Sequence, residues 1–152
     1  MAITETNPVV VGFDTEKPHY DTVFENTKAL KQAGTERHLG GDPNAQVTDT
    51  GFVPVPGLAI VQIDGTNLGG FVIEVHATVK VDGGTGTFRL FDITAAAAVG
   101  STKTFTNTSF ALSVLTGLDG LLAAASHQYR LEVKGAAATD LPVVANAKLV
   151  LR

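Results

Sequence analysis

Alternation of apolar and polar residues, broken only at Val72, marks residues 71–81 as the clearest β-strand of the chain. Successive side chains of a strand point to opposite sides, so one set faces a core and most of the other faces water. The apolar set comprises Phe71, Ile73, Val75, Ala77, Val79 and Val81. A glycine-rich segment, Asp82–Gly86, follows, and a second alternating segment covers Thr87–Thr94. Because glycine tolerates the positive φ of tight turns, the pattern predicts a β-hairpin.

Similar patterns predict five further strands. They cover Leu58–Asp64, Lys103–Thr106, Phe110–Leu115, His127–Lys134 and Val144–Leu151. Short strands with one polar face each, separated by turn signals and without crossover helices, are typical of antiparallel sheets. We therefore expect an all-β fold, an antiparallel two-sheet sandwich of jelly-roll type.

Alanine runs occupy three of the predicted connections. They are Ala95–Ala98, Ala123–Ala125 and Ala136–Ala138. Small apolar loops suit close approach to another surface, where larger side chains would clash. The alternative is that these positions merely tolerate small residues, or that one run forms a short helical turn.

The first third of the chain has a different pattern, with one helical segment between extended stretches. Thr22 and Glu25 form a capping box, and Gly34 ends a helix predicted near 21–33. We place a boundary at Pro54–Gly57, so an extended N-terminal arm with one short α-helix covers 1–57 and the sandwich domain covers 58–152. A helix of about a dozen residues is marginal alone, so the arm is expected to dock on its own sandwich or on a neighbouring chain. The candidate partner contacts in the arm are Val9, Val10, Val11, Phe13, Tyr20, Val23, Phe24 and Leu30.

Composition narrows the possible functions. The chain is 44% hydrophobic, which is enough for a packed core. Eleven basic and fifteen acidic residues give a net charge of −4, which argues against a nucleic-acid partner held by phosphate contacts. The absence of cysteine excludes disulfides, thiolate zinc sites and cysteine nucleophiles. The sequence contains neither a secretory signal pattern nor an apolar run of about 20 residues, so we expect folding in a cytoplasm and no membrane partner.

No arrangement of residues indicates a reaction. No serine lies in a nucleophile-elbow motif, and the glycine-rich turn lacks the lysine of a phosphate-binding loop. Glu74 and His76 share a strand face, where a metal pair is conceivable, but a solvated sheet face explains them better. Glu74 with Asp92 or Glu132 is a conceivable carboxylate pair for glycoside hydrolysis, whose separation the sequence does not give. We therefore expect no enzyme, with no catalytic residues, no cofactor and no metal site.

Carbohydrate binding is a further possibility, because many jelly rolls bind sugars. Such sites usually need an exposed aromatic platform, and the chain has no tryptophan. Phe91 is the one aromatic residue of the sandwich domain predicted on an outer face. A carbohydrate-binding module therefore stays open as an alternative.

Several segments resemble those of small jelly-roll domains on tailed bacteriophages, namely capsid decoration (cement) proteins and fibre proteins. The segments are Thr87–Thr94, Gly100–Ser101, His127–Val133 and Ala147–Leu151. Tyr20–Leu30 is similar to the short helical element near the start of some phage appendage proteins. The resemblance implies a virion structural protein on the capsid surface, assembled in the host cytoplasm. It implies the major capsid protein or another virion protein as partner, and a homo-oligomer, with a trimer favoured. A fibre-tip or carbohydrate-binding module for host recognition is the alternative function.

Overall fold

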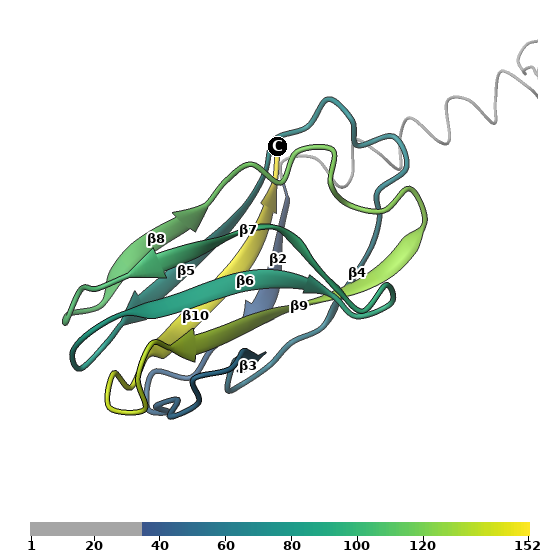
Figure 1. The fold of residues 1–152 in the computed structure, drawn as a ribbon. Helices are drawn as coiled ribbons and strands as arrows, with labels where there is room; N and C mark the ends of the chain where they lie inside the picture. The colour runs from purple at the N-terminus through teal and green to yellow at the C-terminus, as the bar shows by residue number, and fades with distance from the viewer. Residues whose placement is uncertain (1–34) are drawn as a thin grey trace, which may run out of the picture.

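A computed structural model of the chain describes residues 35–152, which form two antiparallel sheets facing each other (Figure 1). One sheet has the strand order β2-β10-β5-β8, and the other has the order β3-β9-β6-β7, with β4 also paired to β9. The strands of the first sheet are β2 (Thr35–Gly40), β10 (Val143–Leu151), β5 (Ile73–Lys80) and β8 (Ala111–Leu115). Those of the second are β3 (Val53–Pro54), β4 (Val61–Asp64), β9 (Ser126–Gly135), β6 (Gly86–Asp92) and β7 (Ala97–Phe105).

The topology is that of a jelly roll, which confirms the predicted fold class for the described residues. β3 and β4 pair with successive parts of β9, so together they act as one interrupted strand. Counting them as one gives eight strands in two four-stranded sheets. Within residues 35–152, no helix is long and apolar enough to cross a lipid bilayer.

The predicted hairpin between residues 71–81 and 87–94 is wrong. β5 pairs with β10 and β8, whereas β6 pairs with β9 and β7, so the two segments lie in different sheets. The turn between them crosses from one sheet to the other. Each of the two strands has one apolar face. Strands of this kind can pack against each other across the core from opposite sheets, or they can pair side by side within one sheet. The alternation therefore fixed which residues are buried but not which strand is the neighbour.

The predicted division at residue 57 also needs correction, because residues 35–57 belong to the sandwich. β2 is hydrogen-bonded along β10, and three apolar side chains of this segment are buried in the core, Leu39, Val47 and Val55. The sequence missed β2 because its letters, TERHLG, are mostly polar. β2 is an edge strand, and such a strand needs few apolar residues. The predicted helix near 21–33 and all eight predicted contact residues of the arm lie outside the described residues.

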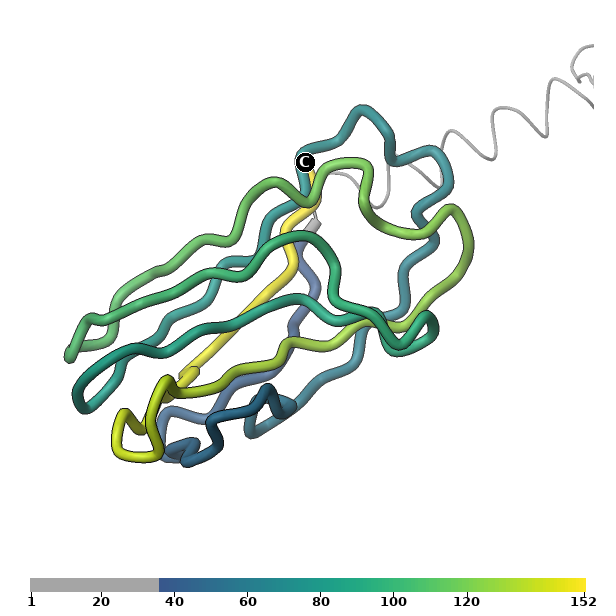
Figure 2. Tube along the Cα trace, in the orientation of Figure 1, coloured from purple at the N-terminus to yellow at the C-terminus, as the bar shows by residue number. Residues whose placement is uncertain are grey.

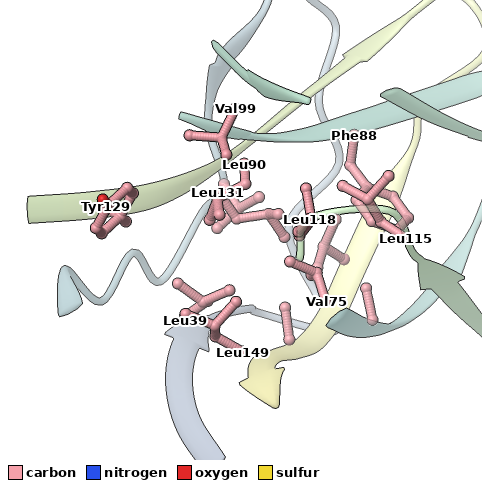
Figure 3. Packing of buried hydrophobic residues seen from close by; sticks show 14 of the residues in the cluster. Leu39, Val75, Phe88, Leu90, Val99, Leu115, Leu118, Tyr129, Leu131 and Leu149 are labelled. Atoms are coloured by element: carbon pink, nitrogen blue, oxygen red, sulfur yellow. The ribbon is translucent and has the colours of Figure 1, made fainter. Parts of the chain in front are cut away.

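Alternate residues of the central strands form one apolar layer between the sheets (Figure 3). Val75 and Leu149 enter it from one sheet, and Phe88, Leu90 and Leu131 enter from the other, all with essentially no exposed surface. Strands β5 and β6 show a regular alternation of buried and half-buried residues. The core positions predicted for residues 71–81 are confirmed from Ile73 to Val81, while Phe71 is partly buried against the same layer.

Connections between strands lie at both ends of the sandwich (Figure 2). Hydrogen bonds of backbone groups hold several of these connections in place. At the end that holds the C-terminus, Val72 exchanges two hydrogen bonds with Arg152, and Gly65 N–H donates to the carbonyl of Ala123. At the other end, the Asp140 carboxylate accepts hydrogen bonds from the backbone N–H groups of Thr85, Ala136 and Ala137. Asp140 therefore joins the β5–β6 and β9–β10 connections.

The alanine run 136–138 takes part in this contact through its backbone, while its side chains are exposed. Ala136 and Ala137 present their backbone N–H groups to Asp140 Oδ2 at 3.0 and 2.9 Å. On the opposite side of the carboxylate, a Cβ added at Gly84 would lie 2.1 Å from Asp140 Oδ1. Gly84 also has a φ of +70°, which glycine adopts without strain. In the run 95–98, by contrast, the last two alanines begin β7, which extends well beyond the predicted strand Lys103–Thr106.

Acid should weaken the Asp140 contact. The N–H of Ala137, followed by that of Thr85, holds the pKa of Asp140 below the usual aspartate range, although burial acts in the opposite direction. A depressed pKa stabilises the fold above the unfolded-state value of about 4, and this contribution is lost as pH falls through the folded-state pKa. Urea unfolding of Asp140→Asn between about pH 6 and 2 should show a weaker acid dependence than the parent chain. Asp49→Asn, at an exposed position, is the control, and an unchanged acid dependence in Asp140→Asn would contradict the assignment.

Shortening a core side chain should be costly. Leu131 is fully buried, so Leu131→Ala removes transfer free energy and leaves a cavity, and we expect a loss of about 2–5 kcal/mol in the free energy of unfolding. Thr102→Ala on the exposed part of β7 should change it by less than about 0.5 kcal/mol. Because the chain has no tryptophan, far-UV circular dichroism is the suitable signal for the urea titration. Equal losses in the two variants would show that the core is misassigned.

Candidate functional site

The outer side of the second sheet carries a strip of polar, charged and aromatic side chains, centred on β9. Tyr129, Leu131 and Val133 face the core, so the alternate residues of the strand face outward. We call these outward residues of β9 and their outward neighbours on the adjoining strands the β9 face. Its members are Ser126, Gln128, Arg130, Glu132 and Lys134 on β9, Thr87, Arg89 and Phe91 on β6, Phe52 and Pro54 at β3, and Gln62 and Asp64 on β4.

Glu132 lies at the centre of the β9 face and is almost completely buried, with 2% of its surface exposed. Arg89 Nε and Nη2 lie 2.9 and 2.7 Å from Glu132 Oε1. Arg130 Nε and Nη2 lie 3.0 and 2.6 Å from Oε2. Each carboxylate oxygen is therefore held by one guanidinium group. A buried charge is tolerated only when it is paired and hydrogen-bonded in this way.

Two phenylalanines lie against the same cations. The Arg89 guanidinium carbon is 4.1 Å from the ring centroid of Phe52 and 5.1 Å from that of Phe91. Arg130 is also 5.1 Å from the Phe91 centroid, and Lys134 Nζ is 4.8 Å from the Phe52 centroid. Cations within about 6 Å of an aromatic ring are attracted by its quadrupole. The rings thus help to fix the directions of all three basic side chains, and they are themselves half-buried.

Neutral polar groups continue the β9 face beyond the charged cluster. Gln62 and Gln128 are cross-strand neighbours, and both are exposed. Gln62 Nε2 donates a hydrogen bond of 2.6 Å to Ser126 Oγ. From Ser126 to Lys134 the strand rises by about 26 Å at about 3.3 Å per residue. The β9 face is therefore an extended strip of amide, hydroxyl, guanidinium and aromatic groups, which suits binding rather than bond breaking.

A second polar cluster anchors loops at one end of the sandwich. The Asp92 carboxylate lies 2.6 Å from His127 Nδ1 through Oδ2 and accepts a hydrogen bond from Ala95 N–H through Oδ1. Tyr129 Oη accepts a hydrogen bond from Ala123 N–H, and burial, with a further contribution from Asp92, raises the pKa of its phenol. Asp92 and Tyr129 both bind backbone N–H groups of connections. The cluster therefore holds the β6–β7 and β8–β9 connections in place.

The conceivable carboxylate pair for glycoside hydrolysis is wrong. Glu74 is on β5 in the first sheet, whereas Asp92 and Glu132 are on β6 and β9 in the second, with the core between them. Glu74 and His76 do share a face as predicted, and they contact each other at 2.9 Å. Glu74 Oε1 also lies 3.1 Å from Arg152 Nη1. The Glu74 carboxylate therefore already has two partners on the outer side of the first sheet. Within residues 35–152, no group of three or more potential metal ligands was found together.

Sequence reasoning identified Phe91 as a surface residue and named Glu132 only in the conceivable carboxylate pair. Phe91 was expected on an outer face, and the structure places it there, half-buried, beside Arg89 and Arg130. The sequence did not show that four residues of the site lie together, namely Phe52, Arg89, Arg130 and Glu132. Their outward direction was readable from the alternation of Thr87–Thr94 and His127–Lys134. That β6 and β9 are neighbours was not readable, because the turn signal suggested a different partner for β6.

Comparison with known proteins yields a similarity of fold. No protein-family model matches the chain, and no curated protein matches its sequence. Among solved structures the chain is similar to a carbohydrate-binding module, CBM36, in complex with calcium and xylotriose. The match has a TM-score of 0.45 at 11% sequence identity and covers 78% of this chain and 99% of that chain. A similarity of this extent does not say what the present chain binds, so the function must be inferred from its side chains.

Neutralising the buried carboxylate should destabilise the sheet. Glu132→Gln leaves two guanidinium groups without their shared counter-charge and replaces charge-assisted hydrogen bonds by weaker ones. We expect a loss of about 1–3 kcal/mol in the free energy of unfolding, measured by urea titration. Glu36→Gln is the matched control, because its ion pair with Lys148 is exposed and should contribute less than about 1 kcal/mol. Equal effects of the two variants would show that Glu132 does not organise the β9 face.

Proposed function

We propose that the chain is a non-catalytic carbohydrate-binding module that holds a saccharide along the β9 face. The observation that carries this proposal is the set of partly exposed rings and fixed hydrogen-bond donors on one outer sheet surface. Phe52 and Phe91 offer apolar ring surface to the C–H groups of a sugar. Arg89, Arg130 and the amide groups of the strip offer donors and acceptors to its hydroxyls.

The rigidity of the strip supports a recognition role. Its side chains stand on paired strands rather than on loops, and their own contacts restrict them before any ligand arrives. A preorganised surface loses less side-chain entropy on binding, so more of the interaction energy appears as affinity. The length and openness of the strip suit an extended, chain-like ligand rather than a compact molecule.

A structural subunit of a phage particle is the second candidate, which rests on the resemblance of the sequence to phage jelly-roll proteins; exposed apolar residues on and beside the edge strand β8 would serve a protein contact in that role. Leu112 is 63% exposed and Phe110 is 43% exposed, and contiguous exposed apolar side chains mark protein contact surfaces. In that role the partner would be the major capsid protein or another virion protein. The chain would then act as an oligomer, with a trimer favoured, on the capsid surface.

A glycan array probed with the full-length chain tests the first candidate. Phe91→Ala should weaken binding to the recognised glycan at least about tenfold, since an anchoring aromatic contact commonly contributes 1.4 kcal/mol or more. Phe110→Ala is the matched control, because Phe110 is an exposed phenylalanine outside the β9 face that also lies beside a lysine, Lys80. Its glycan binding should equal that of the parent chain.

Two results would replace the first candidate by the second. One is the absence of specific binding to any glycan. The other is an oligomer in analytical ultracentrifugation that Leu112→Asp converts to a monomer. Glycan binding that Phe110→Ala weakens as strongly as Phe91→Ala would mean that the saccharide lies elsewhere on the molecule.

A further inference from the structure

The β9 face is positively charged, although the chain as a whole is not. Arg89, Arg130 and Lys134 supply three positive charges, and Glu132 supplies one negative charge, so this cluster has a net charge of +2. Asp64, beside Ser126 at the far end of the strip, reduces the net charge of the whole β9 face to +1. The complete chain has a net charge of −4. The local charge is therefore opposite in sign to that of the molecule, and it is concentrated where the proposed function places the ligand.

Within the described residues 35–152, both arginines have donors that no contact uses. Their contacts with Glu132 use Nε and Nη2 of each guanidinium group. The contacts found among residues 35–152 leave Nη1 of both arginines unused, and both side chains are about one-quarter exposed. Glu132 thus fixes the orientation of two guanidinium groups on neighbouring strands without consuming all of their hydrogen bonds. Guanidinium groups suit oxyanions such as carboxylate, sulfate and phosphate.

A neutral ligand would fit these groups poorly. Covering Arg89 and Arg130 with an uncharged saccharide removes water from two cations that share a single counter-charge, and desolvation of unpaired charge is costly. An anionic substituent placed between Arg89, Arg130 and Lys134 would balance the remaining charge. Gln62 and Gln128, further along the strip, would meet uncharged hydroxyls of neighbouring sugar units.

We infer that the saccharide bound by the β9 face is acidic, carrying carboxylate, sulfate or phosphate groups that the Arg89–Arg130–Lys134 cluster holds. This inference rests on the proposed function, because it names the class of ligand for the same surface. Arg89 and Arg130 bind and orient the anionic group, and Lys134 adds attraction. Phe91, between the two arginines, contacts the sugar ring that bears the group.

The test compares acidic glycans with their neutralised forms on one array: uronate oligosaccharides against their methyl esters, and sulfated glycans against desulfated ones. The parent chain should bind the acidic member of a pair at least about tenfold more tightly, because paired charges in a partly desolvated site contribute strongly. Raising the salt concentration from about 0.05 to 0.5 M should weaken this binding, since the Debye length falls well below 10 Å.

Two lysine substitutions then locate the charge effect without disturbing Glu132. Lys134→Gln should weaken binding of the acidic glycan about two- to fivefold, as expected for a partly exposed ion pair. Lys80→Gln is the matched control, because Lys80 is also a half-buried strand lysine over a phenylalanine ring, but on β5 of the other sheet. It removes the same charge and should leave the affinity unchanged.

The outcomes separate the two claims. Specific binding of neutral glycans, or equal binding of both members of each pair, overturns the acidic-ligand inference and leaves the carbohydrate-binding proposal intact. Acidic-glycan binding that Lys80→Gln weakens as much as Lys134→Gln also overturns the inference, because the attraction would then be non-local. Binding of no glycan overturns the proposed function itself.

Discussion

Alternate side chains of β5, β6, β9 and β10 share one dry layer, and the rest of the structure depends on this constraint. A slip of one residue in any of these strands would turn its apolar set outward and its polar set inward. On β9 the register that buries Leu131 must also direct Glu132 away from the core. Pairing with β6 then places Arg89 directly opposite Glu132. The core thus determines the position of every member of the β9 face.

Burial of the Glu132 carboxylate costs stability, but the carboxylate also fixes the directions of two arginine side chains. Removing this carboxylate from water is unfavourable, and the two arginines offset this by supplying four short contacts. In return, two flexible side chains acquire fixed directions on an open surface. A ligand that meets Arg89 and Arg130 finds donors already in place and does not have to order them. Under the proposed function, one residue would therefore link stability with recognition.

From the sequence alone, the local structure was predicted more accurately than the pairing of the strands. Alternation identified the sandwich, the jelly-roll class and the buried faces of residues 73–81, because burial of apolar side chains dominates the choice of strand face. It paired β6 with β5, because a glycine-rich turn looks alike whether it joins two strands of one sheet or crosses between two sheets. It missed β2, whose polar letters reflect an edge position. It found Phe91 but not the cluster around Glu132, because that cluster exists only through the pairing of β6 with β9.

The most direct test of the account is to map the bound ligand on the full-length protein by NMR. The chain, labelled with ¹⁵N, would be titrated with the oligosaccharide of highest affinity among those tried. The account predicts that amide shifts change on the second sheet, around residues 87–91 and 128–134 and near Phe52. Changes centred instead on the opposite sheet, around His76 and Lys148, or confined to the connections at either end of the sandwich, would contradict the assignment of the β9 face as the binding surface.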